Sequence, residues 1–428
     1  MTSIDFFSLF SENTVAFFVI ATIVIAIFVI IANKLADSWL NPIKFNVFQA
    51  GIGIAVACYI YYLGEATLET FLYVIFSSIL FWSVLCFLYP KKPGRFGLKI
   101  KNEGFYSYYL FLVIYFGNIA LQLFSYARFG IPIFNDDSRL STFTGSGGFG
   151  VISRLNGFFR VYSMFFIFNR YITNERTNWP KLILWLAPLI LFGVLSGSRS
   201  SFLAFIFGFW GFKQFYRREE VYLSNFKALL VPFVIVAVLT FALEHSTNIA
   251  GGVLSFLERV MACGDLYWEA MPNDTWADVT IKTPFKDLLV GFLGPLRILP
   301  ESSTDVPIGY QLTQIVQGYD KMTGPVELFP ISSLIYFGYW GGIIMVIVQA
   351  LLACFFVKLF YRHSDSLIFS SLLYYAFYDS IYFVGSLRNA TGQLFDILLN
   401  IAFVAFLCFC IGLLESVLQP SSKTFSKV

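Results

Sequence analysis

Long apolar runs recur along almost the whole sequence, and they limit what this chain can fold into. A transmembrane helix needs about 20 consecutive, mostly apolar residues to cross the hydrocarbon core of a bilayer. Runs near this length cover residues 14–33, 45–64, 69–90, 105–127, 151–171, 181–197, 200–216, 228–245, 329–357, 366–386 and 393–415. The sequence therefore predicts an all-α polytopic membrane protein with about 11 transmembrane helices, forming a single integral membrane domain over residues 1–428.

The composition agrees with a membrane protein and narrows its chemistry. Hydrophobic residues make up 57% of the chain and charged residues only 13%, against about 25% charged residues in a soluble domain. Of the six cysteines only Cys263 lies outside the apolar runs, and the sequence has no Cys-x-x-Cys pair and no Cys/His cluster. We expect neither a disulfide framework nor a structural zinc site.

The connections between successive predicted spans lie alternately on the two sides of the membrane, and Lys and Arg are unevenly divided between these two sets. In membrane proteins the cytoplasmic connections are enriched in Lys and Arg. The basic set includes segments 91–101, 170–181, 213–227 and 358–362, whereas the opposite set holds most of the acidic residues. The basic side is therefore predicted to be cytoplasmic. The N-terminus would lie outside and the C-terminus inside, as an odd number of spans requires.

One long segment, residues 246–328, joins the eighth and ninth predicted spans and lies wholly on the outer side. Loops of this length are usually functional. Its first part (251–270) predicts an amphipathic helix, with Glu258, Asp265 and Glu269 on the side opposite the apolar residues. We expect the spans to form a frame and this partly helical loop to close over a site at the membrane face.

The predicted outer face has few basic residues, but four of its connections each contain arginine. The first large outer loop covers 128–150, and the others are a short SGSRSS turn, the long loop and the last outer connection. The candidate anion-binding residues are Arg139, Arg199, Arg259, Arg297 and Arg388. Guanidinium groups bind phosphate bidentately and stay charged at any relevant pH. Contact with lipid headgroups, or ion pairs with acidic residues of the loops, is the alternative explanation.

The acidic residues form fewer patterns that suggest a catalytic or metal site. The polar stripe with Asp265 and Glu269 could supply a general base, and a solvated helix face is the alternative. Asp136 and Asp137 are adjacent rather than spaced as Asp-x-Asp, which favours a turn over a metal site. Asp379 and Asp396 lie inside predicted spans, and each must pair with another group or face a cavity.

Several of these segments together resemble a known family. They are the GIPIF…R…GSGG…RLNG stretch, the SGSRSSFLAF turn, the long outer loop, FGYWGG and LRNATGQLFDILLN. Over most of the chain the pattern is similar to the bacterial oligosaccharide repeat-unit polymerases, the Wzy-type O-antigen polymerases. Arg139 with Gly150 resembles the family's arginine–spacer–glycine arrangement, and Arg199 resembles the arginine of its small-residue turn. Arg259 and Arg297 match the second large loop loosely, because the spacing to the next glycines departs from the family's.

The resemblance implies a GT-C-related fold and an undecaprenyl-pyrophosphate-linked oligosaccharide substrate. The expected activity is metal-independent glycosyl transfer without a cofactor, which joins repeat units of O-antigen, capsule or exopolysaccharide. It would occur on the periplasmic face of the bacterial inner membrane. Arginines would neutralise the pyrophosphate leaving group, and Asp265, with Glu269 as second choice, would take the proton of the acceptor hydroxyl. Membrane lipid is an expected partner and a chain-length regulator protein is a candidate one, whereas no nucleic acid is expected.

Two other functions stay open at this point. An O-antigen ligase is expected to have a histidine in its long outer loop, and here only His245 borders that loop. A lipid-linked oligosaccharide flippase or a transporter is usually built from repeats with a site at the membrane midplane. No internal repeat is visible in this sequence, and its polar residues concentrate in the outer loop.

The division of Lys and Arg generates a topological prediction. Reporter fusions after Ser302 should report an extracytoplasmic location, and fusions after Arg176 and Arg218 should report a cytoplasmic one. The measurement is the paired activity of a periplasmic and a cytoplasmic reporter at each position. A cytoplasmic signal at Ser302 would contradict both the orientation and the mechanism expected from it.

Overall fold

The computed structural model describes residues 1–131, 150–172, 178–196, 200–219, 221, 256–300, 303–318 and 324–418. Its α-helices are α1 (Ser3–Glu12), α2 (Thr14–Leu35), α3 (Pro42–Tyr62), α4 (Leu68–Leu88), α5 (Glu103–Phe129), α6 (Gly150–Tyr171), α7 (Trp179–Leu195), α8 (Ser200–Gly211), α11 (Asp265–Ala270), α12 (Pro284–Leu293), α13 (Ile308–Gln317), α14 (Ile331–Phe360), α15 (Leu367–Ser380) and α16 (Leu387–Leu418). Shorter elements are η2 (Phe212–Arg217), η3 (Ala262–Gly264), η4 (Thr275–Asp278), η6 (Ile381–Val384), β1 (Gly94–Phe96) and β2 (Arg362–Ser364).

Among the described residues, seven helices are long and apolar enough to cross a membrane. They are Thr14–Leu35, Pro42–Tyr62, Leu68–Leu88, Glu103–Phe129, Ile331–Phe360, Leu367–Val384 and Leu387–Val417. The prediction of an all-α membrane protein is confirmed at this level. The count of eleven spans stays a prediction, because the apolar run at 228–245 lies outside the described residues.

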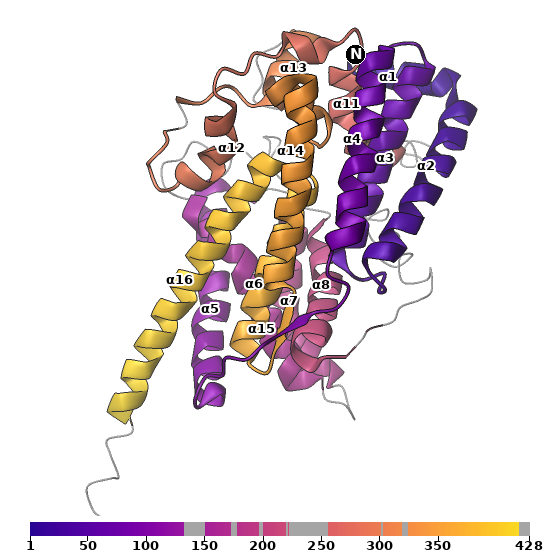
Figure 1. Cartoon of the computed structure of the whole chain (residues 1–428). Coiled ribbons are helices and arrows are strands. Elements are labelled where there is room, and N and C mark those ends of the chain that lie inside the picture. Colours follow the sequence, from indigo (N-terminus) through magenta and orange to yellow (C-terminus); the bar gives the residue numbers. More distant parts are fainter. Residues whose placement is uncertain are drawn as a thin grey trace, which may run out of the picture. The chain divides into compact units, whose positions relative to one another are not determined.

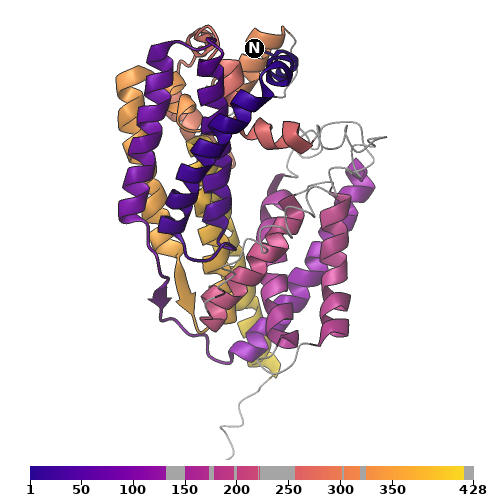
Figure 2. The ribbon, with the colours of Figure 1, turned by 90° about the vertical axis from the view of Figure 1, so that its right-hand side faces the viewer.

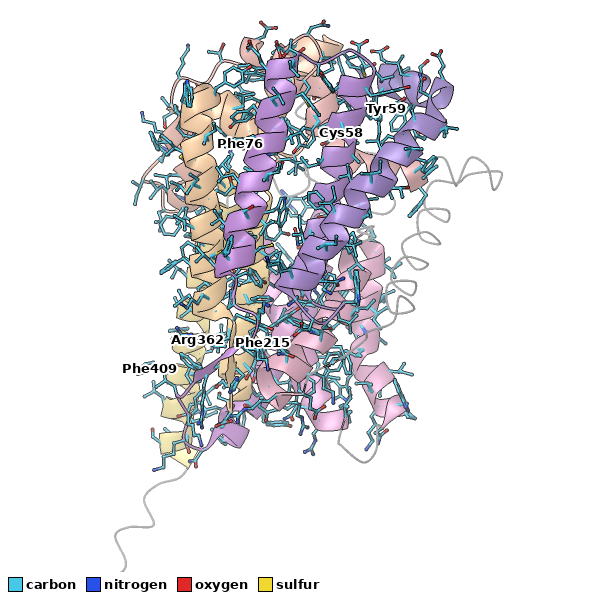
Figure 3. All side chains as sticks on the ribbon, turned by 45° about the vertical axis from the view of Figure 1, so that its right-hand side comes forward. Cys58, Tyr59, Phe76, Phe215, Arg362 and Phe409 are labelled. Carbon is cyan, nitrogen blue, oxygen red and sulfur yellow. The ribbon has the colours of Figure 1, made fainter. Side chains whose placement is uncertain are left out.

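The exposed faces of these helices are apolar, as lipid contact requires. Phe76 on α4 is 54% exposed and Phe409 on α16 is 65% exposed. Both side chains lie on the outside of the ribbon (Figure 3). Burying such faces in hydrocarbon removes the unfavourable contact with water, which is worth roughly 25 cal/mol per Å².

Contacts between Cα atoms divide the chain into two units, and candidate spans occur in both. Unit 1 comprises Met1–Lys92, Tyr222–Tyr361 and Phe377–Phe395. Unit 2 comprises Pro93–Val221, Arg362–Ala376 and Asp396–Val428.

Helix α3 is the central buried element of unit 1 and packs against α2, α4, η3 and α11. Its small residues allow this close approach, as is common between membrane helices. A Cβ atom on Gly51 would lie 2.9 Å from the ring of Phe28, and one on Gly53 would lie 3.2 Å from the carbonyl oxygen of Cys263. The long loop is thereby seated directly on a span.

At one end of unit 1 the N-terminal helix, the α3–α4 connection and the long loop come together (Figure 1). The ring of Phe6 stacks on Trp268 with centroids 4.6 Å apart. The backbone N–H of Asn273 donates to the carbonyl oxygen of Glu65 at 3.1 Å. The sequence assigned all three segments to the same side, and unit 1 places them at the same end. Which side of the membrane this is stays a prediction.

The start of the long loop differs from the continuous amphipathic helix expected at 251–270. In its described part, residues 256–261 are helical, η3 interrupts the helix, and α11 follows. The interruption lies where Gly264 packs on Val56 of α3. Helix α11 is enclosed by neighbours, so Glu269 is 5% exposed and does not belong to a solvated face.

Unit 2 is organised around α6, which packs against α5, α7 and α8 (Figure 2). Strands β1 and β2 pair in parallel, with Gly94 opposite Arg362. Beside them, Asp365 forms ion pairs with Arg95, Lys99 and Arg218. Three connections that the sequence assigned to the cytoplasmic side therefore meet around one carboxylate.

The contact at Gly264 generates a prediction about stability. A Cβ atom at this position would lie 2.7 Å from Val56 Cβ, so α11 or α3 would have to shift. We expect Gly264→Ala to destabilise the protein by about 1–3 kcal/mol, measured as a lower thermal midpoint in detergent. Gly104→Ala is the matched control, because a Cβ atom there meets nothing within 4 Å. An unchanged midpoint for Gly264→Ala would contradict the tight seating of the loop.

Candidate functional site

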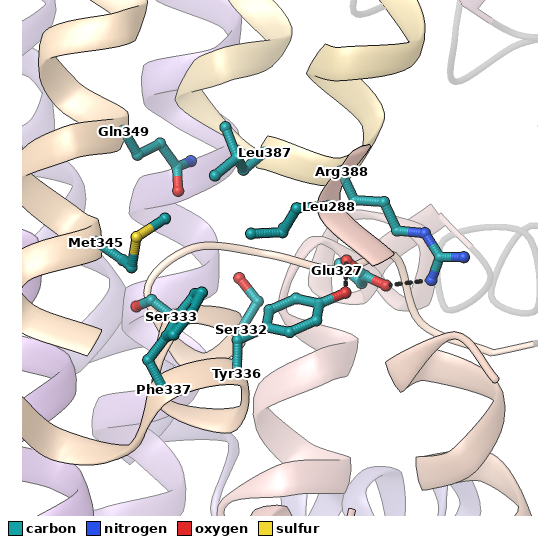
Figure 4. A pocket seen from close by; sticks show the side chains of 10 residues that line it. All are labelled: Leu288, Glu327, Ser332, Ser333, Tyr336, Phe337, Met345, Gln349, Leu387 and Arg388. Atoms are coloured by element: carbon teal, nitrogen blue, oxygen red, sulfur yellow. Dashed lines mark hydrogen bonds and ion pairs between the residues drawn. The ribbon is translucent and has the colours of Figure 1, made fainter. Parts of the chain in front are cut away.

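The best-defined polar site lies in unit 1, where the first turn of α16 meets the segment that precedes α14. Arg388 Nη1 donates to Glu327 Oε1 at 3.0 Å, and the Tyr336 hydroxyl donates to Glu327 Oε2 at 3.1 Å. The side chains of Arg388 and Glu327 are only 13% and 8% exposed. Figure 4 shows the three groups converging on one side of a small pocket. We call this group the Arg388 pocket.

Local folding fixes both partners of the ion pair. Ser386 caps α16, since its hydroxyl oxygen accepts from the backbone N–H of Asn389 at 3.2 Å. The N–H of Phe329 donates to the carbonyl oxygen of Gly385 at 2.9 Å. The Tyr267 hydroxyl of α11 in turn donates to the carbonyl oxygen of Phe329 at 2.8 Å. The segment with Glu327, the start of α16 and the long loop are therefore bonded together.

The Arg388 pocket is amphipathic and small. Besides the ion pair and Tyr336, its lining residues are Leu288, Ser332, Ser333, Phe337, Met345, Gln349 and Leu387. The space inside is about 10 Å³, which is near the minimum that holds one water molecule. This space is the size of one water molecule or one hydroxyl group.

Arg388 and Glu327 balance each other's charge inside this pocket, but Glu327 does not use every hydrogen-bond donor of the guanidinium group. A buried guanidinium is costly unless it is paired and hydrogen-bonded, and Glu327 supplies the pairing. The remaining nitrogens of Arg388 point away from Glu327 (Figure 4). Nearby, Asp287 is fully buried; its Oδ1 accepts from the N–H of Asp305 at 2.9 Å, and its Oδ2 has no hydrogen-bond partner in the described part of the chain.

Burial controls how Glu327 titrates. It raises the pKa of Glu327 above the ordinary value, and the opposing influences are the charge of Arg388 and the hydrogen bonds from Arg388 and Tyr336. A carboxylate whose pKa is raised binds a proton more readily than an exposed one. Glu327 thus anchors Arg388, and burial favours its protonated form while Arg388 and Tyr336 favour the carboxylate.

A second polar group surrounds Glu269 in α11. The Thr313 hydroxyl donates to Glu269 Oε2 at 3.3 Å, and Gln317 Nε2 donates to Glu269 Oε1 at 3.4 Å. Burial raises the pKa of both Asp265 and Glu269 to about 7. Both carboxyl groups are therefore partly protonated at neutral pH, which suits acid–base work and also fits buried structural hydrogen bonds.

The other predicted arginines are distributed differently. Arg259 and Arg297 are exposed and do not line the Arg388 pocket. The backbone of Arg297 is left-handed, with φ 58°. Arg139 and Arg199 lie outside the described residues, so their roles stay predictions.

Sequence reasoning did not single out Glu327 or Asp287. Glu327 is an isolated acid in the segment GPVELFP directly before a predicted span, and such an acid in apolar surroundings needs a cationic partner. That pattern could have identified it. The expectation that Asp396 must be paired is confirmed, because Asp396 forms an ion pair with Arg154 within unit 2.

Comparisons with known proteins do not assign a function to this site. No protein-family model, no curated protein and no solved structure matches the chain. Within the described ranges, no group of three or more His, Cys, Asp or Glu side chains could hold a metal ion. The interpretation of the site therefore rests on its geometry and on the resemblance of the sequence motifs.

The buried carboxyl of Glu269 generates a prediction about pH. Its pKa is raised from 4.5 to about 7, so the folded state holds the proton more tightly than the unfolded state. The resulting stabilisation is complete below about pH 4.5 and is lost as the pH rises through about 7. We expect Glu269→Gln to have a shallower pH dependence of the thermal midpoint in detergent than the unchanged protein.

Glu258→Gln, in the preceding helical turn, is the matched control for this measurement. It should keep the pH dependence of the unchanged protein. The same slope in Glu269→Gln and in the unchanged protein would show that the Glu269 carboxyl does not titrate in this range.

Proposed function

We propose that the protein is a polysaccharide polymerase that joins undecaprenyl-pyrophosphate-linked oligosaccharide repeat units at the outer face of the bacterial inner membrane. The observation that carries this proposal is the Arg388 pocket, where a guanidinium group is held on one side by Glu327 while its other nitrogens point away from that carboxylate. A lipid-linked substrate is supported by the apolar spans around the pocket. The resemblance of the outer-loop motifs to Wzy-type polymerases, and a GT-C-related fold, belong to the same proposal.

The chemistry requires one bond to break and one to form. The bond between the anomeric carbon of the donor glycan and its pyrophosphate oxygen breaks, and the electron pair leaves with the lipid pyrophosphate. The acceptor hydroxyl oxygen then bonds to the anomeric carbon, and its proton passes to a carboxylate. Arginine stabilises the departing anion by charge-assisted hydrogen bonds, a role that needs no cofactor.

Three carboxylates are candidates for the proton acceptor. Asp265 is the first choice of the sequence pattern, and Glu269 is the second. Glu327 joins them because it lies 3.0 Å from the Arg388 guanidinium, where a bound pyrophosphate would place the reacting centre. In this proposal the sugars bind at the pocket mouth, and only a hydroxyl-sized group enters it.

In this proposal the remaining arginines bind the substrate around the Arg388 pocket. Arg259 and Arg297 are exposed, and in this proposal they contact the large, anionic, lipid-linked glycan outside the pocket. Arg139 and Arg199 are included on the resemblance alone. Membrane lipid surrounds the spans, and a chain-length regulator protein is a further candidate partner.

The proposal predicts the effect of removing the Arg388 guanidinium. Arg388→Ala should lower polymerisation by about 10²- to 10³-fold, and Arg388→Lys should restore little, because an ammonium group loses the fork geometry. The measurement is glycan chain length in a deletion strain that carries each variant. Lys358→Ala, an exposed cation near the other end of α14, is the control and should give normal chains.

Arg388→Ala alone leaves Glu327 buried without its partner, which costs about 3–5 kcal/mol and can impair folding. The double variant Arg388→Gln with Glu327→Gln keeps the pocket neutral and hydrogen-bonded, and it should fold but not polymerise. Normal chains from this double variant would contradict the proposed site. The product separates the alternatives: polymerase loss leaves single repeat units on the lipid, ligase loss leaves long unattached chains, and flippase loss leaves none outside.

A further inference from the structure

Helix α12 of the long loop has two contrasting faces. Its inner face holds Asp287, which is fully buried, and Leu288, which is 6% exposed. Its outer face carries Phe285 and Leu289, which are 66% and 45% exposed. A helix of a water-exposed loop would present polar residues outward, so this surface needs an apolar neighbour.

The inner face ties α12 to the first turns of α16. A Cβ atom on Gly291 would lie 2.7 Å from the backbone nitrogen of Gly392, so the two helix backbones nearly touch. The Thr391 hydroxyl donates to the carbonyl oxygen of Leu288 at 2.6 Å. On the same side as Phe285 and Leu289, the ring of Phe292 contacts Phe395, with centroids 6.4 Å apart, so this end of the outer face borders α16. These contacts fix α12 beside a candidate span rather than above it.

The other end of α12 reaches a second candidate span. The ring of Phe285 lies 5.5 Å from that of Phe337 in α14, centroid to centroid. Beyond the non-helical residue Gly338 of α14, Trp340 is 83% exposed and Ile344 is 62% exposed. Tryptophan is enriched where membrane helices cross the interface between water and hydrocarbon. The outer face of α12 therefore contacts the N-terminal end of α14, whose following residues Trp340 and Ile344 are exposed and apolar.

Basic residues accompany this apolar surface. Lys282 precedes α12 and Lys286 lies in its first turn, and both are exposed. The acidic residue of that turn, Asp287, is buried on the opposite face. Exposed lysines beside exposed apolar side chains are the pattern of helices that lie in a membrane interface and attract anionic lipids.

We propose that α12 is a membrane-interface helix, which inserts Phe285 and Leu289 among lipid acyl chains and holds anionic phospholipid headgroups with Lys282 and Lys286. The occupant of this surface is the bilayer itself. The contact is a property of the loop and does not depend on the reaction that the protein catalyses.

Photochemical crosslinking tests this contact in the full-length protein. Phe285, or separately Leu289, is replaced by p-benzoylphenylalanine, and the protein is irradiated in nanodiscs of phosphatidylcholine and phosphatidylglycerol. Intact mass spectrometry should show a mass increase of one phospholipid at both positions. The same replacement at Ile344 is the positive control, and replacement at the exposed loop residue Asp278 should give no lipid adduct.

The crosslinking results distinguish a lipid contact of α12 from a contact with a second copy of the chain. Absence of lipid adducts at both α12 positions, with adducts at Ile344, would overturn the proposal. A crosslinked dimer would replace the bilayer by a second copy of the chain. In the Lys282→Glu, Lys286→Glu variant, the phosphatidylglycerol share of the adducts should fall, and an unchanged share would refute the headgroup contact. None of these readouts requires polymerase activity, so they are independent of the proposed function.

Discussion

Polar groups that lie among apolar helices have no water to bind, and this constraint shapes the structure more than any other. Each charge inside the frame must have a partner supplied by the protein. Arg388 has Glu327, and Asp396 has Arg154. Because these partners come from distant parts of the sequence, the pairs also join segments that apolar packing alone would leave free to slide.

The same constraint explains why the long loop is folded. A polar loop on a membrane protein could remain loosely attached, but this one is seated on α3 through Gly53 and Gly264. Its α11 holds the segment leading to α14 through Tyr267 and Phe329. The loop therefore belongs to the packed body of unit 1, and the Arg388 pocket depends on both loop and spans.

Much of this architecture could be predicted from the sequence, for identifiable reasons. The spans follow from the length of apolar runs, since α2, α4 and α14 begin within a few residues of the predicted positions. The pairing partner of Arg388 could not be predicted, because Glu327 is distant in sequence and only the fold brings it near. The interruption before α11 was also missed, since helical periodicity does not record that Gly264 meets Val56.

Helix α14 is not a continuous rod, because Gly338 has φ 66° and ψ −173° within it. Only glycine adopts this conformation without strain, and it breaks the ladder of hydrogen bonds between successive turns. The break separates the short piece with Ser333 and Tyr336 from the hydrogen-bond ladder of the rest of the span. Its orientation is set by contacts outside the helix, because Ser333 Oγ forms a hydrogen bond with the Tyr73 hydroxyl of α4 at 3.0 Å and the Tyr336 hydroxyl donates to Glu327 at 3.1 Å. The wall of the Arg388 pocket that Tyr336 forms is therefore positioned by a different span and by the loop, and not by the long membrane part of α14.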